Sequence, residues 1–527
     1  MERHASESYD VMGEGLLAVS AGGRARATAP GAPFRFSRMG PRGDGCQLED
    51  TTIPKLARNM VRGGGSTDEV SGVPAGYTYL GQFVAHDLSF DKTTVTLGEN
   101  ISPARLREGT SPALDLDSLY GAGPHDPLSA RFYERDRVRL KTGTTVAVPR
   151  HRAEDGFDLP RGGGDRRAER RKAVIADERN DDNVAVAQTH LWFIRFHNSV
   201  VKRLRAESVP HGLLFERARA LVTKHYQWVV RHDYLPLICD DTVLDDVFGG
   251  GRDAFEVDAA RGDMPTMPIE FSIGAFRLGH SMVRNHYRWN HLRDTLTLEE
   301  LFVFAGKGGN LGGKERLPSD VISDFRRMYD FRDTGLADFV VDDDMLNRAM
   351  RIDTRIVTAL GKLPAGAFGE PGERSPPLDA NLAFRNLTRA KMVQLASGPQ
   401  MAEFLTRRGV KLTPLSPDQI LKGRDGTTLH GFDAKAKQDL VEHAPLWFYI
   451  LREAELNGGK LSGVGARIVA ETFHRAIEAS AASIVRKPDW RPTLRGDGTH
   501  FGMPDLLLVA CREDPRLMAP LESRRRR

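Results

Sequence analysis

The sequence predicts a mainly α-helical protein, built as a single large helical domain with little β structure. Helical patterns dominate over residues 51–510, strand-like alternation is short and scarce, and no linker-like segment divides the chain. The clearest helix covers residues 183–207, where side chains three or four positions apart share one face. These side chains are Leu191, Ile194, Asn198 and Val201.

The 527 residues divide into three expected regions. Residues 1–50 are rich in Gly, Ala, Arg and Pro without periodicity, which indicates an irregular N-terminal arm. Residues 51–510 form the helical domain. Residues 511–527 end in Ser-Arg-Arg-Arg-Arg and are expected to form a basic C-terminal tail.

The composition is that of an ordinary globular protein, with a net charge of +4, 40% hydrophobic residues and a mean hydropathy of -0.40. This mild and dispersed positive charge does not indicate a nucleic-acid partner. No stretch approaches the roughly 20 apolar residues of a membrane span, and the N-terminal apolar run is too short for a secretory signal. Three widely separated cysteines favour a reducing compartment. We therefore expect a cytoplasmic protein without a membrane span, and the sequence leaves its oligomeric state open.

Residues 77–90, YTYLGQFVAHDLSF, form the first helix with chemical interest. On a helix Gln82 and His86 lie one turn apart on the same face, whereas Asp87 is rotated away from them by about 100°. A core histidine bonded to a neighbour would explain His86 taken alone. The alternative is that His86 and Asp87 serve two different sites on the two sides of the helix.

Residues 111–121, SPALDLDSLYG, place oxygen atoms at alternate positions. The atoms belong to the side chains of Ser111, Asp115 and Asp117 and to the carbonyl group of Ala113. This spacing suits a hard cation such as Ca²⁺, which takes roughly six to eight oxygen ligands. The same pattern is common in solvated turns. Asp87 would be the ligand that the first helix contributes.

Arg179 lies just before the long helix at residues 183–207. From this position its guanidinium group could reach into a pocket. The alternative is a surface arginine that pairs with Asp181 or Asp182.

His280 follows an apolar run in the segment 270–287, with Arg277 about one turn earlier on the same side. A buried histidine at such a place can ligate a metal or a haem iron. A core histidine is the alternative for this segment taken alone.

Four segments occur in one order along the chain: GQFVAHDL, SPALDLDSLYG, DERNDDN and FRLGHSMVRNHY. In this order they resemble the animal-type haem peroxidases of the peroxidase–cyclooxygenase superfamily, and especially its bacterial members. The resemblance covers about residues 50–510 and implies the helical fold of that family.

The resemblance implies a haem site with two sides. On the distal side, where peroxide binds, it implies catalytic roles for His86, Arg179 and Gln82. On the proximal side it implies that His280 is the axial iron ligand and that Arg277 pairs with a haem propionate. It also implies a structural calcium ion, whose ligands would be Asp87, Ser111, Ala113, Asp115 and Asp117.

Two departures from the family pattern concern the attachment and tuning of the haem. Relatives with covalent haem need an acid where this chain has Ala85, and a methionine where it has Asn183. Only Asp182, shorter than the usual Glu, is left as a tether, so the resemblance implies haem b bound non-covalently or by at most one ester. The family's amide beside the proximal histidine aligns with Pro399, which leaves the neighbouring Gln400 as the candidate.

We therefore expect an enzyme that reduces hydrogen peroxide and oxidises a small donor such as a halide, thiocyanate or an organic molecule. One alternative is a fatty-acid dioxygenase of the same superfamily, although those relatives have a tyrosine where this chain has Arg277. A non-haem metalloprotein that uses His86, Asp87 and His190 is a second alternative. A haem-binding protein without activity is the third.

Overall fold

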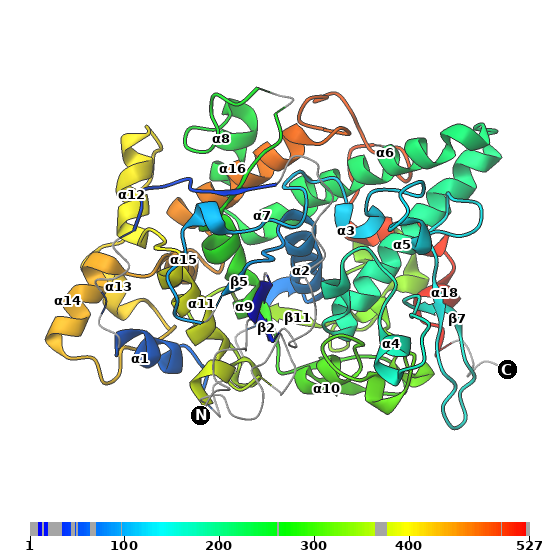
Figure 1. Ribbon diagram of the computed structural model, residues 1–527, viewed down its shortest axis with the longest axis horizontal. Helices are drawn as coiled ribbons and strands as arrows, with labels where there is room; N and C mark the ends of the chain where they lie inside the picture. The colour runs from blue at the N-terminus through cyan, green and yellow to red at the C-terminus, as the bar shows by residue number, and fades with distance from the viewer. Residues whose placement is uncertain are drawn as a thin grey trace.

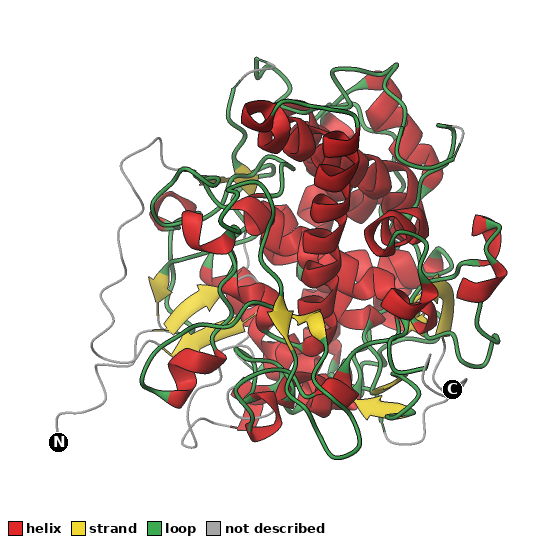
Figure 2. Ribbon diagram, turned by 90° about the vertical axis from the view of Figure 1, so that its right-hand side faces the viewer, coloured by secondary structure: helices red, strands yellow, loops and turns green. Residues whose placement is uncertain are grey.

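Helices form the body of the molecule and small sheets lie toward its periphery (Figure 2). The computed structural model describes residues 9–12, 15–18, 34–43, 48, 51–63, 70–95, 97–260, 263–363, 377–496 and 498–522. The chain is 48% helical and 9% strand, which confirms the predicted mainly α class. The first nine helices are α1 (Thr52–Asn59), α2 (Gly76–Leu88), α3 (Asp117–Tyr120), α4 (Arg167–Arg171), α5 (Val184–Ala206), α6 (His211–Val229), α7 (Leu235–Ile238), α8 (Asp241–Gly250) and α9 (Gly279–Met282). The next nine are α10 (Leu298–Val303), α11 (Leu382–Met392), α12 (Gly398–Arg407), α13 (Pro417–Lys422), α14 (Ala434–His443), α15 (Leu446–Leu456), α16 (Gly463–Ala479), α17 (Met503–Cys511) and α18 (Pro515–Met518).

Helix α2 lies at the centre of the molecule (Figure 1) and is buried on almost every side. A helix that is apolar all round belongs in a core, and α2 matches this rule except for a few polar side chains. Its two partly exposed residues, Gln82 and Ala85, both line the cavity described below. The polar residues of α2 are therefore placed for chemistry or for ligand binding.

Helix α5 confirms the long helix predicted at residues 183–207. Asn183 caps its N-terminus, because the side-chain oxygen accepts a hydrogen bond of 2.9 Å from the backbone N–H of Val186. The helix packs against α2, α6 and α17. This packing fixes the residues just before α5 against the C-terminal half of α2.

Two π-helical segments interrupt the regular helices. The first, η4 (Val230–Tyr234), joins α6 to α7. The second, η5 (Glu270–Gly274), leads through the 3₁₀ helix η6 (Ala275–Leu278) into α9. Such turns occur often at functional sites, and both segments contribute side chains to the same cavity.

The strands are short and pair locally. A three-stranded antiparallel sheet has the order β2-β1-β5, and four strand pairs complete the set. Of these pairs, β3–β8 is parallel, whereas β4–β11, β6–β7 and β9–β10 are antiparallel. The strands are β1 (Tyr9–Met12), β2 (Gly15–Ala18), β3 (Phe36–Ser37), β4 (Val70–Pro74), β5 (Thr94–Val95), β6 (Gly143–Thr144), β7 (Asp155–Asp158), β8 (Met267–Pro268), β9 (His286–Arg288), β10 (Thr295–Thr297) and β11 (Arg348–Met350).

Part of the expected N-terminal arm is attached to the helical body. The backbone N–H groups of Met39 and Gly40 donate to the buried carboxylate of Glu270 at 2.9 and 3.2 Å. Because Glu270 begins η5, this arm segment rests against the chain that leads to His280. Most of residues 1–33 lies outside the described part of the chain.

The C-terminal boundary expected at residue 510 falls inside a packed region. Helix α17 continues through Cys511, and the side chains of Met518 and Leu521 are buried in the core. The difference arises because apolar side chains are interspersed among the basic residues of this segment, while residues 523–527 lie outside the described part. Among the described residues, no helix combines the length and the apolar content that crossing a membrane requires.

Candidate active site

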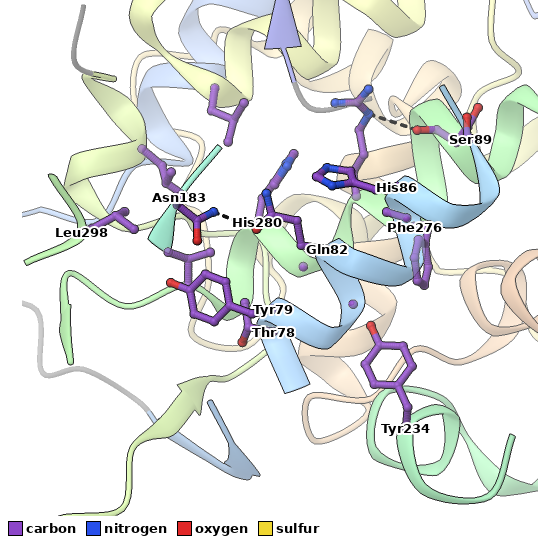
Figure 3. A pocket seen from close by; sticks show the side chains of 18 of the residues that line it. Thr78, Tyr79, Gln82, His86, Ser89, Asn183, Tyr234, Phe276, His280 and Leu298 are labelled. Carbon is purple, nitrogen blue, oxygen red and sulfur yellow. Dashed lines mark hydrogen bonds between the residues drawn. The ribbon is translucent and has the colours of Figure 1, made fainter. Parts of the chain in front are cut away.

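A central cavity runs along one face of α2 (Figure 3). Thr78, Gln82 and His86, each four residues apart, line it from this helix. Arg277 from η6 and His280 from α9 complete the polar lining that the sequence predicts. The space that protein atoms leave open is about 880 Å³, solvent at the mouth included.

The remaining wall is largely apolar and aromatic, as is typical of sites that bind small molecules or cofactors. The main contributors are Tyr79, Tyr234, Phe271, Phe276, Leu298 and Phe302. Gly279 also lines the cavity, and a Cβ atom added there would meet nothing within 4 Å. The side of α9 next to His280 is therefore open to a ligand.

His86 is held through its Nδ1 atom. The Oδ1 atom of Asn180 lies 2.9 Å from Nδ1, and this amide oxygen can only accept, so Nδ1 carries the proton and Nε2 keeps its lone pair. Burial, together with the charge of Arg179, lowers the pKa of His86 to about 3. The imidazole is therefore neutral at pH 7 and able to accept a proton.

Arg179 lies behind His86 rather than in the wall that the described residues form. Its guanidinium donates to both oxygens of Asp177, with a closest distance of 2.6 Å, and to the carbonyl oxygens of His86 and Ser89 at 2.7 Å each. Burial acts to lower the pKa of Arg179, but the paired Asp177 raises it. The cation is thus permanently charged and fixed at the C-terminal turn of α2.

Gln82 and Asn183 link α2 to the start of α5. Asn183 donates from Nδ2 to Oε1 of Gln82 at 2.9 Å, and both residues line the cavity. Asp182, the expected tether for the haem, is 8% exposed and follows the 3₁₀ helix that precedes α5. It is not among the described residues that line the cavity.

The proximal side differs from the sequence-based expectation at one residue. Nδ1 of His280 lies 2.8 Å from Nδ2 of Asn386, whose Oδ1 accepts from Arg277 at 2.8 Å. Gln400 instead belongs to the capping box of α12, where its Oε1 accepts from the backbone N–H of Ser397 at 2.9 Å. The amide beside His280 therefore comes from α11, whose buried face the sequence alignment did not place against α9.

Burial also lowers the pKa of His280 to about 3, helped by the charge of Arg277. The amide Nδ2 of Asn386 can only donate, so Nδ1 of His280 accepts this hydrogen bond, and Nε2 is the ring nitrogen at which a metal would replace the proton. His280 and His86 thus line one cavity from two helices, each positioned through Nδ1 by an asparagine.

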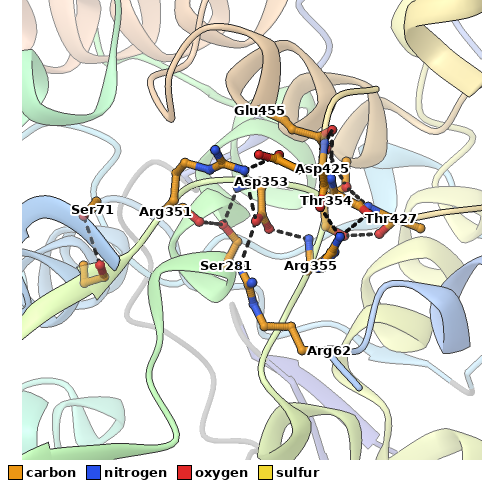
Figure 4. A network of polar contacts seen from close by, with 12 residues as sticks. Arg62, Ser71, Ser281, Arg351, Asp353, Thr354, Arg355, Asp425, Thr427 and Glu455 are labelled. Carbon is orange, nitrogen blue, oxygen red and sulfur yellow. Dashed lines mark hydrogen bonds and ion pairs between the residues drawn. The ribbon is translucent and has the colours of Figure 1, made fainter. Parts of the chain in front are cut away.

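A polar network anchors α9 from behind (Figure 4). Ser281 Oγ accepts from the backbone N–H of Asp353 at 3.1 Å. Asp353 also pairs with Arg62 at 2.8 Å, and both side chains are almost fully buried. The ion pair therefore holds the loop on which α9 rests.

The expected calcium loop lies against the other side of α2. The carboxylate of Asp87 accepts hydrogen bonds from the backbone N–H groups of Leu116 and Ser118, both at 3.1 Å. Burial and the nearby charge of Asp117 raise the pKa of Asp87 to about 7. The structure thus brings Asp87 and the loop together, as the sequence predicts.

The three carboxylates of this loop region repel one another. Burial, and then the charges of Asp117 and Asp87, raise the pKa of Asp115 well above its usual range. The buried Oδ1 atom of Asp115 has no hydrogen-bond partner among the described residues. Ser111 Oγ accepts from the backbone N–H of Ala113 at 3.2 Å. Within the described chain, however, no group of three or more His, Cys, Asp or Glu side chains is already arranged to hold a metal ion.

Three polar residues near the cavity were not singled out by the sequence. Asn180 and Asn386 position the two histidines. Arg389 is 4% exposed and pairs with Asp91, while its Nε and Nη1 atoms have no hydrogen-bond partner among the described residues. The available signal was the polar face of α11, on which Arg385, Asn386 and Arg389 follow one another at helical spacing.

The fold is mainly helical, and two buried histidines, His86 and His280, line one cavity. Residues 88–305 match the family described as animal haem peroxidase. A peroxidase-like protein of Margaritifera margaritifera is 28% identical over 111 residues, which are 21% of this chain and only 14% of that protein's length.

Solved structures share the fold. Peroxidase A from Dictyostelium discoideum has a TM-score of 0.57 and 14% identity, covering 96% of this chain and 97% of that one. The fatty acid alpha-dioxygenase of Arabidopsis thaliana has a TM-score of 0.53 and 13% identity over 92% of this chain and 77% of the enzyme. That of Oryza sativa has a TM-score of 0.52 and 12% identity over 88% and 77%. Residues 88–305, less than half of the chain, are therefore similar to the animal haem peroxidase family, and the chain shares its fold with a peroxidase and with fatty acid alpha-dioxygenases.

Proposed function

We propose that this protein is a peroxidase, which reduces hydrogen peroxide and oxidises a small halide, thiocyanate or organic donor. The observation that carries the proposal is the pair of buried histidines, His86 and His280, in one cavity. The family implies a haem, and the residues of the cavity fit one. The apolar wall and the open face at Gly279 support this fit.

His280 would hold the iron through Nε2, and Asn386 would keep the ring oriented. Arg277, which lines the cavity, would pair with a carboxylate of the haem. When bound, the haem supplies the redox chemistry, while the protein supplies position and electrostatics. We propose haem b bound without a covalent link, because Ala85 removes one ester site and Asp182 lies outside the described lining. Extraction with acidified organic solvent tests this: haem that remains on the polypeptide contradicts it.

His86 is the proposed acid–base group. Its neutral Nε2 accepts the proton from peroxide and returns it to the leaving oxygen. Arg179, held by Asp177 behind the ring, supplies a fixed positive charge that favours the negative charge developing on that oxygen. Gln82, fixed by Asn183, offers an amide to orient the incoming peroxide.

We also propose a structural Ca²⁺ between α2 and the loop. The chemistry of the donors supports it, since Asp87, Asp115 and Asp117 are carboxylates in a buried place that a divalent cation would neutralise. The side chain of Ser111 and the carbonyl of Ala113 would complete the oxygen ligands.

The test is peroxide turnover by the haem-loaded protein with iodide, thiocyanate and a phenol as donors. Replacing His86 with Gln is expected to keep the Soret band and to slow the reaction with peroxide by roughly 10²–10⁴-fold. His197→Gln is the matched control, because His197 is another fully buried histidine, on α5, whose Nε2 bonds to the carbonyl of Val138. An unchanged rate in His86→Gln rules out this role.

The second candidate is a fatty-acid dioxygenase, which the fold of the two alpha-dioxygenases favours. Against this candidate, the chain has Arg277 at the position where the dioxygenases of the superfamily have a tyrosine. Oxygen uptake with a fatty acid and no peroxide would favour this candidate, and peroxide-dependent oxidation without oxygen uptake would favour the peroxidase.

A further inference from the structure

We propose that three buried tyrosines, Tyr234, Tyr77 and Tyr329, carry oxidising equivalents from the central cavity to a second cavity at the surface. There they would oxidise a phenolic donor too large to enter the central cavity. The inference rests on the proposed peroxidase function, which supplies the oxidant as a haem oxidised by hydrogen peroxide. It adds a second site for the donor.

The three rings form a continuous chain. Tyr234 lines the central cavity, and Figure 3 shows its hydroxyl pointing toward α2. Its ring is stacked on that of Tyr77, with centroids 6.5 Å apart and planes at 15°. Tyr77 meets Tyr329 edge to face at 5.1 Å. All three are at most 4% exposed, so an electron hole on them would be shielded from water.

The middle tyrosine has a proton acceptor in place. The hydroxyl of Tyr77 donates to both carboxylate oxygens of Asp233, at 2.8 and 2.7 Å. Burial raises the pKa of Asp233 to about 6, so the carboxylate is still mainly ionised at pH 7. Burial and Asp233 also raise the pKa of Tyr77 well above its usual range, which keeps the phenol protonated until it is oxidised.

The oxidation step is balanced. Tyr77 loses one electron to the oxidised haem, by way of Tyr234, and its hydroxyl proton moves to Asp233. The products are a neutral tyrosyl radical, a protonated Asp233 and a haem reduced by one electron. A donor phenol at the surface then returns an electron and, through solvent, a proton.

The backbone of α2 is shaped to admit the rings at both ends of the chain. A Cβ atom on Gly76 would collide with the ring of Tyr329, and one on Gly81 would collide with the hydroxyl of Tyr234. Tyr329 also donates to the carbonyl oxygen of Gly76 at 2.8 Å. Two glycines on the helix that carries His86 therefore allow the tyrosines their close approach.

The chain ends at a polar surface cavity. Tyr329 lines a space of about 330 Å³, open solvent included, together with Arg326, Arg332, Asp330 and Asp343. The charged rim distinguishes this cavity from the apolar central one and suits a water-soluble polymeric donor. The ring of Tyr329 at its base would be the point of electron exchange.

The experiment compares a free phenol with the same phenol attached to dextran, a polymer too large for the central cavity. For Tyr77→Phe we expect turnover of the dextran-bound phenol to fall about tenfold or more, while turnover of iodide stays within about twofold. Freeze-quench electron paramagnetic resonance after peroxide addition, without donor, should show a tyrosyl radical that is lost in Tyr77→Phe. Asp233→Asn should also diminish this radical, because the proton acceptor is removed.

Tyr133→Phe is the matched control, since Tyr133 is equally buried but donates to the carbonyl of Tyr120 away from the chain. It should behave as the wild type in both measurements. If Tyr77→Phe does not fold, Tyr329→Phe should show the same fall in turnover of the dextran-bound phenol, while the radical on Tyr77 remains. The inference is overturned if Tyr77→Phe and Tyr329→Phe turn over the dextran-bound phenol as fast as the wild type. It is also overturned if the wild type forms no tyrosyl radical although its Soret band responds to peroxide. In both cases the proposed peroxidase function still stands. A Soret band that does not respond to peroxide overturns the proposed function and the inference with it.

Discussion

At the scale of single residues, the two asparagines beside the histidines decide how the cavity can react. Each amide fixes the ring through Nδ1, but Asn180 accepts from His86 whereas Asn386 donates to His280. Such partners of a metal-binding histidine commonly tune the ligand as much as they orient it.

Asn386→Asp replaces the amide donor by a carboxylate that accepts from an Nδ1–H of His280, and it is therefore expected to lower the reduction potential of the bound haem. Asn386→Leu removes the hydrogen bond and should leave the potential above that of Asn386→Asp. Gln400→Leu is the comparison, and it should leave both the potential and the Soret band unchanged because Gln400 caps α12. Spectroelectrochemical titration of the three variants decides between the two residues, and a shift confined to Gln400→Leu would restore the sequence-based assignment.

His86, Gln82, Arg277 and His280 could be found from sequence because each lies within a short motif, and the structure brings all four to one cavity. Asn386 could not be found in this way, since its contact with His280 joins residues 106 positions apart. The local spacing around Pro399 carried no information on which face of α11 meets α9. The position of Arg179 likewise depends on a tertiary contact, because its guanidinium donates to the carbonyl oxygens of His86 and Ser89 at the end of α2.

At the scale of elements, the short helix α9 depends on its neighbours. A helix of four residues has little stability of its own, and the network around Ser281 and Asp353 supplies the support. Helix α5 was predictable because its length and amphipathic pattern are intrinsic to its own sequence. Helix α9 and the π-helical segments are set by tertiary contacts.

Asp353→Ala should destabilise the protein by about 3–5 kcal/mol, because it leaves the buried charge of Arg62 without a partner. Urea unfolding measures the change. The double variant Arg62→Met, Asp353→Leu should recover much of the loss, since it removes both charges together. A single variant as stable as the wild type would show that the pair does not anchor α9.

At the scale of the whole molecule, the proposed calcium site and the buried histidines predict how unfolding responds to a chelator and to pH. If Ca²⁺ joins α2 to its loop, a chelator should lower the thermal unfolding temperature of the wild type. Asp115→Ala should start from the lower temperature and no longer respond to the chelator. Differential scanning calorimetry with and without added Ca²⁺ checks both statements, and a wild type indifferent to chelation contradicts the proposed site.

Acid should remove the contribution that two buried neutral histidines make to stability. Burial lowers the pKa values of His197 and His225 to about 4, so the unfolded chain binds protons that the folded protein does not. Their contribution to stability is therefore lost as the pH falls from about 6.5 toward 4. Unfolding free energies measured across this range should fall less steeply in His197→Gln, and parallel curves would contradict the assignment.

The π-helical segment η4 determines what the deletion of one residue would do to the helix from α6 to α7. A π turn holds more residues than an α turn, so removing one residue from η4 would leave a continuous ordinary helix from α6 to α7. The helix beyond η4 would keep its orientation, because the π turn absorbs the extra residue locally, and the side chains within η4 would change direction. Asp233, which lies within η4, would then leave the hydroxyl of Tyr77. The deletion of one residue could thus keep the fold and break the contact between Tyr77 and Asp233. The insertion of one residue into a regular helix is the reverse change, by which this contact could have arisen.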